Sequence, residues 1–173
     1  LRKKKNVVFF DIGSYISYYG LYVSSFTNDK GTVYAIESNP LYDKITKKSK
    51  QHNQFKNFNH LNYILSDKCE EYLVHETTVV RKDHLLKYKD NTLIYDQYEK
   101  GKINNILERG KSYQSTTLDE LCSMHKVMPN ILKIDVHGAE GLVINGAKKT
   151  LENSIEYILL EVHQQQLLDL FSN

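Results

Sequence analysis

Carboxylate and imidazole side chains recur in this chain directly after short apolar runs. They are Asp11, Glu37, Asp67, Asp135, His137, Glu161 and His163. Such side chains can accept a proton from a reacting group, hold the hydroxyl groups of a ligand, or bind a metal ion. Continuous apolar runs are typical of buried parallel strands, and ligands bind outside the carboxyl ends of such strands. These residues are therefore candidates for one shared site.

The first constellation is the turn Asp11-Ile-Gly13, followed by Ser14 and Tyr15, together with Glu37. A nucleoside ligand needs a glycine where it approaches the backbone, and an acidic acceptor for its ribose hydroxyls roughly 20 residues or more beyond that turn. The G-x-G-x-x-G fingerprint and the P-loop are absent, so a ligand without phosphates fits better. The alternative is an ordinary strand-to-helix turn with a capping Asp and a surface Glu.

The second constellation joins two segments that each follow a predicted strand and that carry Asp135, His137, Glu161 and His163. In an enzyme, Asp135 or His137 would accept a proton, and Glu161 or His163 would orient the acceptor. A metal ion held by the same side chains is a weaker alternative. Because no compact ligand motif such as H-E-x-x-H occurs, we expect no metal. The plainest interpretation is that local hydrogen bonds satisfy all four side chains.

The elements that must position these residues alternate between strands and helices. The predicted strands are residues 6–11, 32–37, 59–65, 131–136 and 157–162. The predicted helices are residues 16–25, 41–52 and 139–145, with a further short helix that has Thr116 or Thr117 as its N-cap. This alternation predicts a single α/β domain over residues 1–173, with a mainly parallel sheet and helices on both faces.

The middle of the chain, residues 68–114, has the weakest pattern. Short strands are expected near residues 72–74 and 77–80, and residues 83–110 are polar without a clear period. Long segments without secondary structure of their own are usually functional loops or linkers. We therefore interpret residues 68–114 as an insertion or a lid.

The composition excludes several classes of protein. The 173 residues include 40% hydrophobic and 25% charged residues, which is enough for a packed core. The formal net charge of +2 lacks the strong basic field of a dedicated nucleic-acid binder, so nucleic acid is an unlikely partner. No apolar run approaches the roughly 20 residues of a membrane span. The two cysteines, Cys69 and Cys122, form no C-x-x-C pair, and we expect a reduced, cytoplasmic protein.

Taken in order, the motifs resemble those of the FkbM-type S-adenosylmethionine-dependent methyltransferases. The stretches that carry the resemblance are V-F-F-D-I-G (8–13), V-Y-A-I-E-S-N-P (33–40), L-S-D (65–67), T-L-D-E-L (117–121), K-I-D-V-H-G-A-E (133–140) and L-L-E-V-H (159–163). Any one of them alone is a weak signal. Together, and in the order that the family has, they are specific.

The resemblance implies a Rossmann-like class I methyltransferase fold, S-adenosylmethionine as cofactor, and a hydroxyl acceptor on a sugar, a glycan or another small molecule. Glu37 would bind the ribose hydroxyls, Asp67 the adenine amino group, and Asp135 would lie beside the methionine end. Carried over by position, the residues lining the cofactor site would be Asp11, Gly13, Ser14, Tyr15, Glu37, Ser66, Asp67 and Asp135.

The chain departs from the family pattern at three positions in these motifs. Tyr15 replaces an Asn and has the size to fill space that the cofactor takes. Ser17 replaces a Gly, so we expect its backbone to avoid positive φ. His137 replaces a Glu. The family sheet also continues beyond the strand that ends near Glu161, so C-terminal strands are missing or the chain is a piece of a longer protein. The rival to an active enzyme is a non-catalytic scaffold with the same fold.

Overall fold

The protein is described from a computed structural model, which covers residues 6–27, 30–90 and 97–163. Its centre is a five-stranded sheet in the order β3-β2-β1-β8-β9, with every neighbouring pair parallel. These strands are β1 (Val7–Ile12), β2 (Gly31–Glu37), β3 (Phe58–Asn62), β8 (Ile131–Ile134) and β9 (Tyr157–Leu160). The predicted α/β class with a parallel sheet is confirmed, and each of the five strands overlaps a predicted strand.

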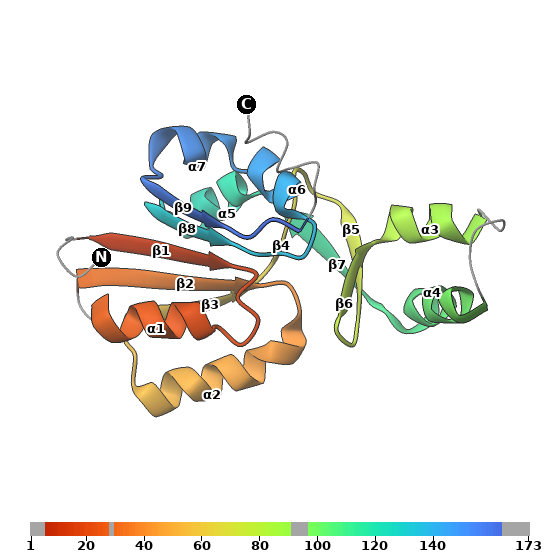
Figure 1. Ribbon diagram of the computed structural model, residues 1–173, viewed down its shortest axis with the longest axis horizontal. Coiled ribbons are helices and arrows are strands. Elements are labelled where there is room, and N and C mark those ends of the chain that lie inside the picture. Colours follow the sequence, from red (N-terminus) through yellow and green to blue (C-terminus); the bar gives the residue numbers. More distant parts are fainter. Residues whose placement is uncertain (1–5, 28–29, 91–96, 164–173) are drawn as a thin grey trace.

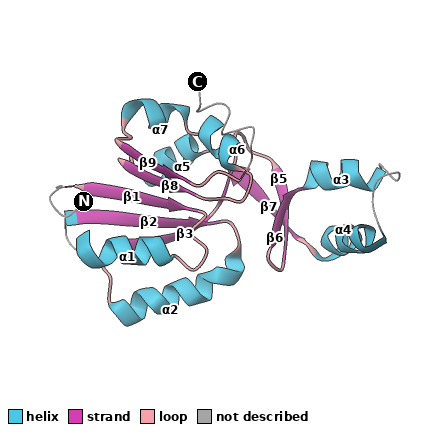
Figure 2. Ribbon diagram, viewed as in Figure 1, coloured by secondary structure: helices cyan, strands magenta, loops and turns pink. Residues whose placement is uncertain are grey.

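Helices cover both faces of the sheet, because successive side chains of its buried strands point to opposite sides. Phe9 packs with residues of α1 (Tyr18–Thr27), while its neighbour Phe10 packs with residues of α5 (Leu118–His125). Figures 1 and 2 show α1 and α2 (Asp43–Asn53) below the sheet, and α5, α6 (Glu140–Asn145) and α7 (Lys148–Asn153) above it. The two apolar layers fix the carboxyl ends of the strands at one edge.

A second, smaller sheet flanks that edge. Its strand order is β4-β7-β5-β6, formed by β4 (Ile64–Leu65), β7 (Lys111–Thr116), β5 (Glu71–His75) and β6 (Thr78–Arg81). β5 pairs antiparallel with both β6 and β7, whereas β4 pairs parallel with β7. The helices α3 (Lys82–Asp90) and α4 (Gln97–Arg109) follow β6 and lie on the side away from the main sheet (Figure 1).

Three local expectations need correction. Residues 59–65 are not one strand, because the chain leaves the main sheet after Asn62 and pairs β4 with β7 instead. Much of residues 83–110 is helical, in α3 and α4, and Leu85 and Ile106 pack these helices on Leu73 of β5. The first helix begins at Tyr18 rather than residue 16, and it buries Gly20 and Val23 while leaving the side chains of Ile16 and Tyr19 exposed.

The capping network of α5 extends to α7. Thr117, one of the two N-cap candidates in the sequence, is the N-cap of α5, and it forms a capping box with Glu120. Asp119 accepts hydrogen bonds from the backbone N–H groups of Lys149 and Thr150 and from the hydroxyl of Thr150. Burial alone would raise the pKa of Asp119, but these hydrogen bonds outweigh it and hold that pKa below its ordinary value. Asp119 thus fastens the start of α7 to α5.

Asp119→Ala should therefore lower the free energy of unfolding at pH 7 by about 1–2 kcal/mol, the usual cost of losing a helix cap. Because the folded state lowers the pKa of Asp119, its contribution is present above the unfolded-state pKa of about 3.9 and is lost as pH falls through the folded pKa. Urea unfolding at pH 7 and pH 3 should show the difference between the two chains shrinking in acid. Glu152→Ala, which removes an exposed carboxylate from α7, is the control. An equal effect of both variants would contradict the assignment.

Candidate functional site

A cavity of about 460 Å³ opens at the carboxyl ends of β1, β2 and β8. Gly13, Tyr15 and Glu37 line one part of it, and Asp135 and His137 line another. Thr77, in the β5–β6 turn, and Val79, on β6, close a further side. The volume lies in the range of about 300–1,000 Å³ that is usual for small-ligand sites.

A smaller cavity of about 100 Å³ adjoins the first and shares Gly13, Ser38, Val79 and Val136 with it. Most of its remaining lining is apolar or aromatic, and comes from Ile12, Ile36, Tyr63, Ile64, Leu65, Tyr72 and Ala139. A flat ring system can lie against such walls, whereas a phosphate would find no cation among these lining residues. The two cavities together therefore suit a ligand with one polar end and one aromatic end.

Glu37 is buried at the end of β2 and organises the turn across from it. Its Oε2 accepts a hydrogen bond of 2.7 Å from the backbone N–H of Tyr15. Its Oε1 accepts one of 2.8 Å from the N–H of Asn39 and one of 3.2 Å from the Ser38 hydroxyl. A carboxylate offers about four acceptor positions, so the hydrogen bonds from described residues leave room for a further hydroxyl. This geometry suits a carboxylate that both shapes the turn and binds a ligand.

Tyr15 and Ser17, in the turn after β1, both have positive φ values, and side-chain contacts stabilise both residues there. Tyr15 has φ 52° and is 55% exposed, and its ring lies edge-on to that of Tyr42 at 4.4 Å, so it forms a wall and leaves the 460 Å³ cavity open. Ser17 has φ 63°, which corrects the expectation that its backbone would avoid the left-handed region. Its buried hydroxyl lies 3.2 Å from that of Ser14 and 3.3 Å from that of Thr46, and these contacts offset the strain.

Lys133 joins the two constellations from beneath the cavity. Its buried ammonium lies 3.4 Å from Oδ1 of Asp11 and 3.2 Å from Oδ2 of Asp135, and it donates to the carbonyl of Gly13 at 3.2 Å. Burial raises the pKa of Asp11, while the charge of Lys133 opposes that rise. Asp11 also accepts the N–H of Gly20 at 2.9 Å, which ties the strand end to α1. Asp11 therefore supports the site from below and does not line the cavity.

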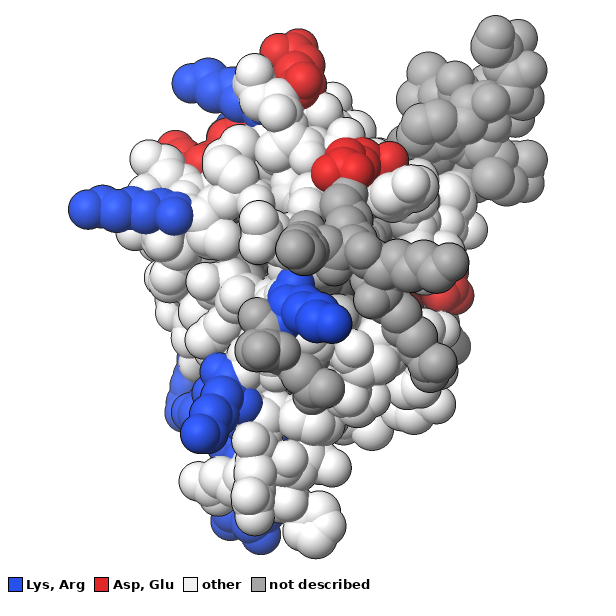
Figure 3. Space-filling model, turned by 90° about the vertical axis from the view of Figure 1, so that its left-hand side faces the viewer, with Lys and Arg blue, Asp and Glu red and all other residues white. Residues whose placement is uncertain are grey.

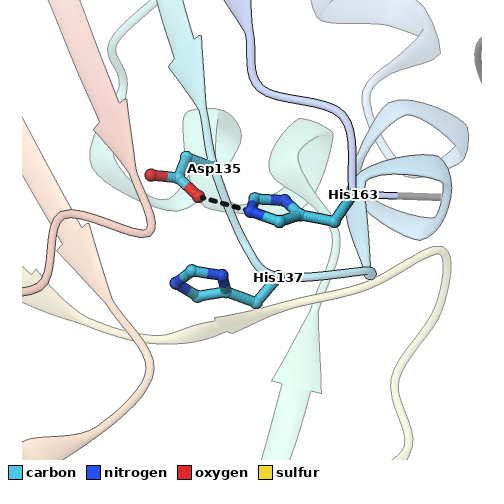
Figure 4. A group of neighbouring side chains, drawn as sticks. All are labelled: Asp135, His137 and His163. Carbon is cyan, nitrogen blue, oxygen red and sulfur yellow. Dashed lines mark ion pairs between the residues drawn. The ribbon is translucent and has the colours of Figure 1, made fainter.

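Asp135, His137 and His163 converge at the ends of β8 and β9 (Figure 4). Nε2 of His163 lies 3.9 Å from Oδ1 of Asp135, and the two imidazole rings are 4.6 Å apart between centroids. Glu161 is mostly exposed, and its Oε1 lies 3.5 Å from Nε2 of His163. The structure thus places all four residues of the second constellation at one corner, although only Asp135 and His137 line the main cavity.

Glu140 holds this corner in shape from a fully buried position. Its carboxylate accepts hydrogen bonds from the backbone N–H groups of Val136 and Gly138, and its Oε1 lies 2.9 Å from Nδ1 of His163. Burial alone would raise the pKa of Glu140, but these hydrogen bonds lower it below its ordinary value. The hydrogen bond between His163 and Glu140 raises the pKa of His163. His137 has φ 51° and Gly138 φ 102°, so Glu140 braces a tightly turned loop.

Three residues of the predicted cofactor set, besides Asp11, do not line either cavity. Ser14 is buried beneath the turn, and Ser66 is buried with its hydroxyl 3.1 Å from that of Tyr72. Asp67 follows β4 in the small sheet and accepts a hydrogen bond from Ser66. Because β4 pairs with β7 rather than with β3, this segment ends outside the shared edge of the main sheet.

Sequence reasoning gave no role to several residues that shape the site. Lys133 and Glu140 belong to the stretch K-I-D-V-H-G-A-E, and a charged residue inside or next to a buried strand is a signal that could have marked both. Ser38, Asn39, Tyr42 and Thr77 line the main cavity as well. Their polar types carry no such signal, because polar residues of these kinds are common in loops.

The described residues on the surface seen in Figure 3 include both basic and acidic side chains, and those of one charge do not form a continuous patch. Among the described residues, no helix is long and apolar enough to span a bilayer. Cys69 and Cys122 are both free thiols.

Comparisons with known proteins identify the family of the chain. The family model described as Methyltransferase FkbM domain matches residues 11–171. The fold resembles a precorrin-6y C5,15-methyltransferase from Geobacter metallireducens GS-15, with a TM-score of 0.52 and 12% identity over 99% of this chain and 62% of that chain. A SAM dependent methyltransferase from Aquifex aeolicus is 25% identical, with a TM-score of 0.34, over 38% of this chain and 34% of that one.

The chain thus spans less than two thirds of the length of either solved structure. No curated protein matches its sequence significantly.

Proposed function

The chain belongs to the FkbM family of S-adenosylmethionine-dependent methyltransferases, and from this premise we propose that it transfers a methyl group to a hydroxyl of a sugar, a glycan or another small molecule. The single observation that carries the proposal is the cavity in which Gly13 and Glu37 face Asp135 and His137. One end has the groups that bind a nucleoside, and the other has groups that can take up a proton.

The residues present fit S-adenosylmethionine. Glu37 keeps acceptor capacity for ribose hydroxyls, and the adjoining apolar cavity suits the adenine ring. Oδ1 of Asp11 is buried 3.4 Å from the ammonium of Lys133, so this ion pair supports the Gly13 turn from below. The exposed ring of Tyr15 can face a sulfonium, because aromatic faces attract cations. When bound, the cofactor supplies a methyl group activated by that positive sulfur.

The chain's own residues would act by position. The Gly13 turn and Glu37 hold the nucleoside, which leaves the part of the cavity beside Asp135 and His137 for the acceptor. Holding two reactants in line accounts for much of the rate enhancement in a displacement of this kind. The acceptor hydroxyl must also lose its proton, and Asp135, His137 and His163 are the groups at that corner that can assist.

Isothermal titration of the chain with S-adenosylmethionine tests the proposal, and we expect micromolar affinity. Glu37→Ala should weaken binding by about 1–3 kcal/mol, the cost of losing a charged acceptor, which corresponds to about 5–150-fold in Kd. The affinity of Glu37→Gln for S-adenosylmethionine should lie between those of the unchanged chain and Glu37→Ala, because glutamine keeps one acceptor oxygen. Thermal unfolding of each variant separates lost binding from lost folding, since Glu37 also anchors Tyr15 and Asn39.

Glu76→Ala is the matched control, because it removes a carboxylate that is absent from the cavity lining. If the unchanged chain gives no heat at millimolar cofactor, the protein is a scaffold with a methyltransferase fold and the proposal fails.

A further inference from the structure

We propose that Asp135, His137 and His163 bind a divalent transition-metal ion at the acceptor end of the cavity. Each offers one ligand atom, and these atoms all lie within 4.8 Å of one another. The sequence led us to expect no metal, because the ligands form no compact motif. His163 is far from Asp135 and His137 in the sequence, but the fold brings the three together, because β8 and β9 are neighbours whose carboxyl ends lie side by side (Figure 4).

The separation between ligand atoms suits a shared cation better than a hydrogen bond. Oδ1 of Asp135 and Nε2 of His163 are 3.9 Å apart, which is beyond hydrogen-bonding distance. Metal–nitrogen and metal–oxygen bonds of about 2.0–2.2 Å place two ligand atoms of one ion about 3–4 Å apart. Closing the whole group around an ion therefore requires only small side-chain movements.

Asp135 is prepared to act as the carboxylate ligand. Its Oδ2 is fixed by the ammonium of Lys133 at 3.2 Å. Its Oδ1 is buried and receives no hydrogen bond from the residues that the structure describes. A buried carboxylate oxygen without a partner costs free energy, and a cation bound there would remove that cost. Figure 4 shows this oxygen directed at the ring of His163, above that of His137.

His163 is oriented for metal binding by a second carboxylate. Nδ1 lies 2.9 Å from Oε1 of Glu140, which is itself fully buried and held by the N–H of Gly138. Metal-binding histidines usually donate their other ring N–H to such a carboxylate, which fixes the tautomer and the ring plane. With Nδ1 held in this way, Nε2 faces Asp135 and is the atom that would bind the ion. This arrangement is the strongest single sign that the corner is built for an ion.

His137 completes the group from an unusual backbone conformation. Its φ of 51° is uncommon for a residue with a side chain, and such strain tends to occur at functional sites. Its ring is exposed, stands 4.6 Å from that of His163, and makes no hydrogen bond to any other described residue. Two imidazoles this close repel each other when both are protonated, whereas two neutral rings can share one cation.

Two imidazoles and one carboxylate are the ligand set of catalytic zinc and non-haem iron sites, which keep open positions for water or substrate. Glu161, with Oε1 3.5 Å from Nε2 of His163, offers a further oxygen at the rim. Resting on the proposed function, the ion would bind an acceptor through two adjacent oxygens, as in a vicinal diol. It would lower the pKa of the bound hydroxyl, whose proton leaves to solvent.

The test measures metal binding directly and needs no activity. The full chain, without a histidine tag and stripped with a chelator, is titrated calorimetrically with zinc chloride in the absence of S-adenosylmethionine. We expect one ion per chain. His163→Ala and His137→Ala should each weaken binding at least about 100-fold. Glu140→Gln should weaken it about 10–100-fold, the usual effect of losing an outer carboxylate.

His52→Ala, which removes an exposed histidine from α2, is the matched control and should bind zinc like the unchanged chain. Cobalt(II) provides a second readout, because its visible absorption reports nitrogen ligation in whichever variants remain folded. The inference is overturned if the unchanged chain binds no zinc, or if the His137 and His163 variants bind it as the His52 variant does.

The two proposals can fail separately. A chain that binds S-adenosylmethionine and no zinc keeps the proposed function and loses the metal site. A chain that binds zinc at this group and no S-adenosylmethionine keeps the metal site and loses the proposed function.

Discussion

His137→Ala should reduce methyl transfer by about 10²–10⁴-fold and leave the affinity for S-adenosylmethionine within about twofold. The reason is its position, because the ring lines the cavity beside Asp135 and is not among the groups around Glu37. It assists the acceptor either by taking up the proton itself or by holding a cation that lowers the pKa of the acceptor hydroxyl. The rate is measured as S-adenosylhomocysteine released with the best acceptor from a panel of sugars and diols, and affinity by calorimetry.

Companion variants identify how the corner works. Asp135→Asn should reduce the rate of methyl transfer as much as His137→Ala does. If a metal ion acts at this corner, His163→Ala should reduce the rate to the same extent. If Asp135 alone accepts the proton, His137→Ala will be nearly silent while Asp135→Asn remains severe. His52→Ala should retain the full rate. Unchanged activity in both the His137 and Asp135 variants would show that positioning alone drives transfer and that this corner is not the reacting end.

The main sheet could be predicted because burial on both faces leaves a strong trace in the sequence. The segments 7–10 and 131–134 are almost wholly apolar or buried, and each ends where a polar residue begins. That pattern also located Asp135, His137 and His163 at one edge, since parallel strands bring their ends together. The motifs also occur in the order that the FkbM family has, and this order identified S-adenosylmethionine as the cofactor.

Two strands of the small sheet, β5 and β6, were expected near residues 72–74 and 77–80, but β7 and the helices beside the sheet left no such trace. β7 buries only one of its six residues, and its sequence K-S-Y-Q-S-T has no apolar run. Ion pairs between β5 and the residues around β6, such as Glu71 with Lys82 and Glu70 with Arg81, help to hold this layer. Interactions of this kind depend on the final pairing of strands, which single-sequence reasoning does not provide.

Site details depended on side-chain directions that the residue types do not fix. Tyr15 is large enough to block the cavity, but its ring packs edge-on against that of Tyr42. Ser17 takes a glycine-like φ because Ser14 and Thr46 lie within reach of its hydroxyl. In both cases a deciding partner comes from the segment after β2, where Tyr42 immediately precedes α2 and Thr46 lies within it, and spacing along the chain does not reveal it.

Gly13→Ala should produce the largest loss of stability of any single methyl addition in the turn. Gly13 has φ 71°, where a side chain is strained, and a Cβ built there would lie 1.8 Å from the carbonyl oxygen of Asp135 and 2.7 Å from its carbonyl carbon. Neither atom can move aside easily, because Asp135 follows β8, which pairs directly with β1. Backbone strain of about 1–3 kcal/mol adds to the cost of separating the two strand ends.

We expect Gly13→Ala to lower the free energy of unfolding by at least about 3 kcal/mol, which for a chain of this size corresponds to a fall in Tm of about 6–12 °C. Gly101→Ala is the matched control. A Cβ at Gly101 meets nothing within 4 Å, and the residue lies inside α4, so the same substitution should raise stability by about 0.5–1 kcal/mol. Equal Tm values for the two variants would mean that the turn after β1 does not pack against the end of β8. If Gly13→Ala still folds, its affinity for S-adenosylmethionine should also fall. The added methyl group would push Asp135, at the end of β8, away from the Gly13 turn, and both line the cavity with Glu37.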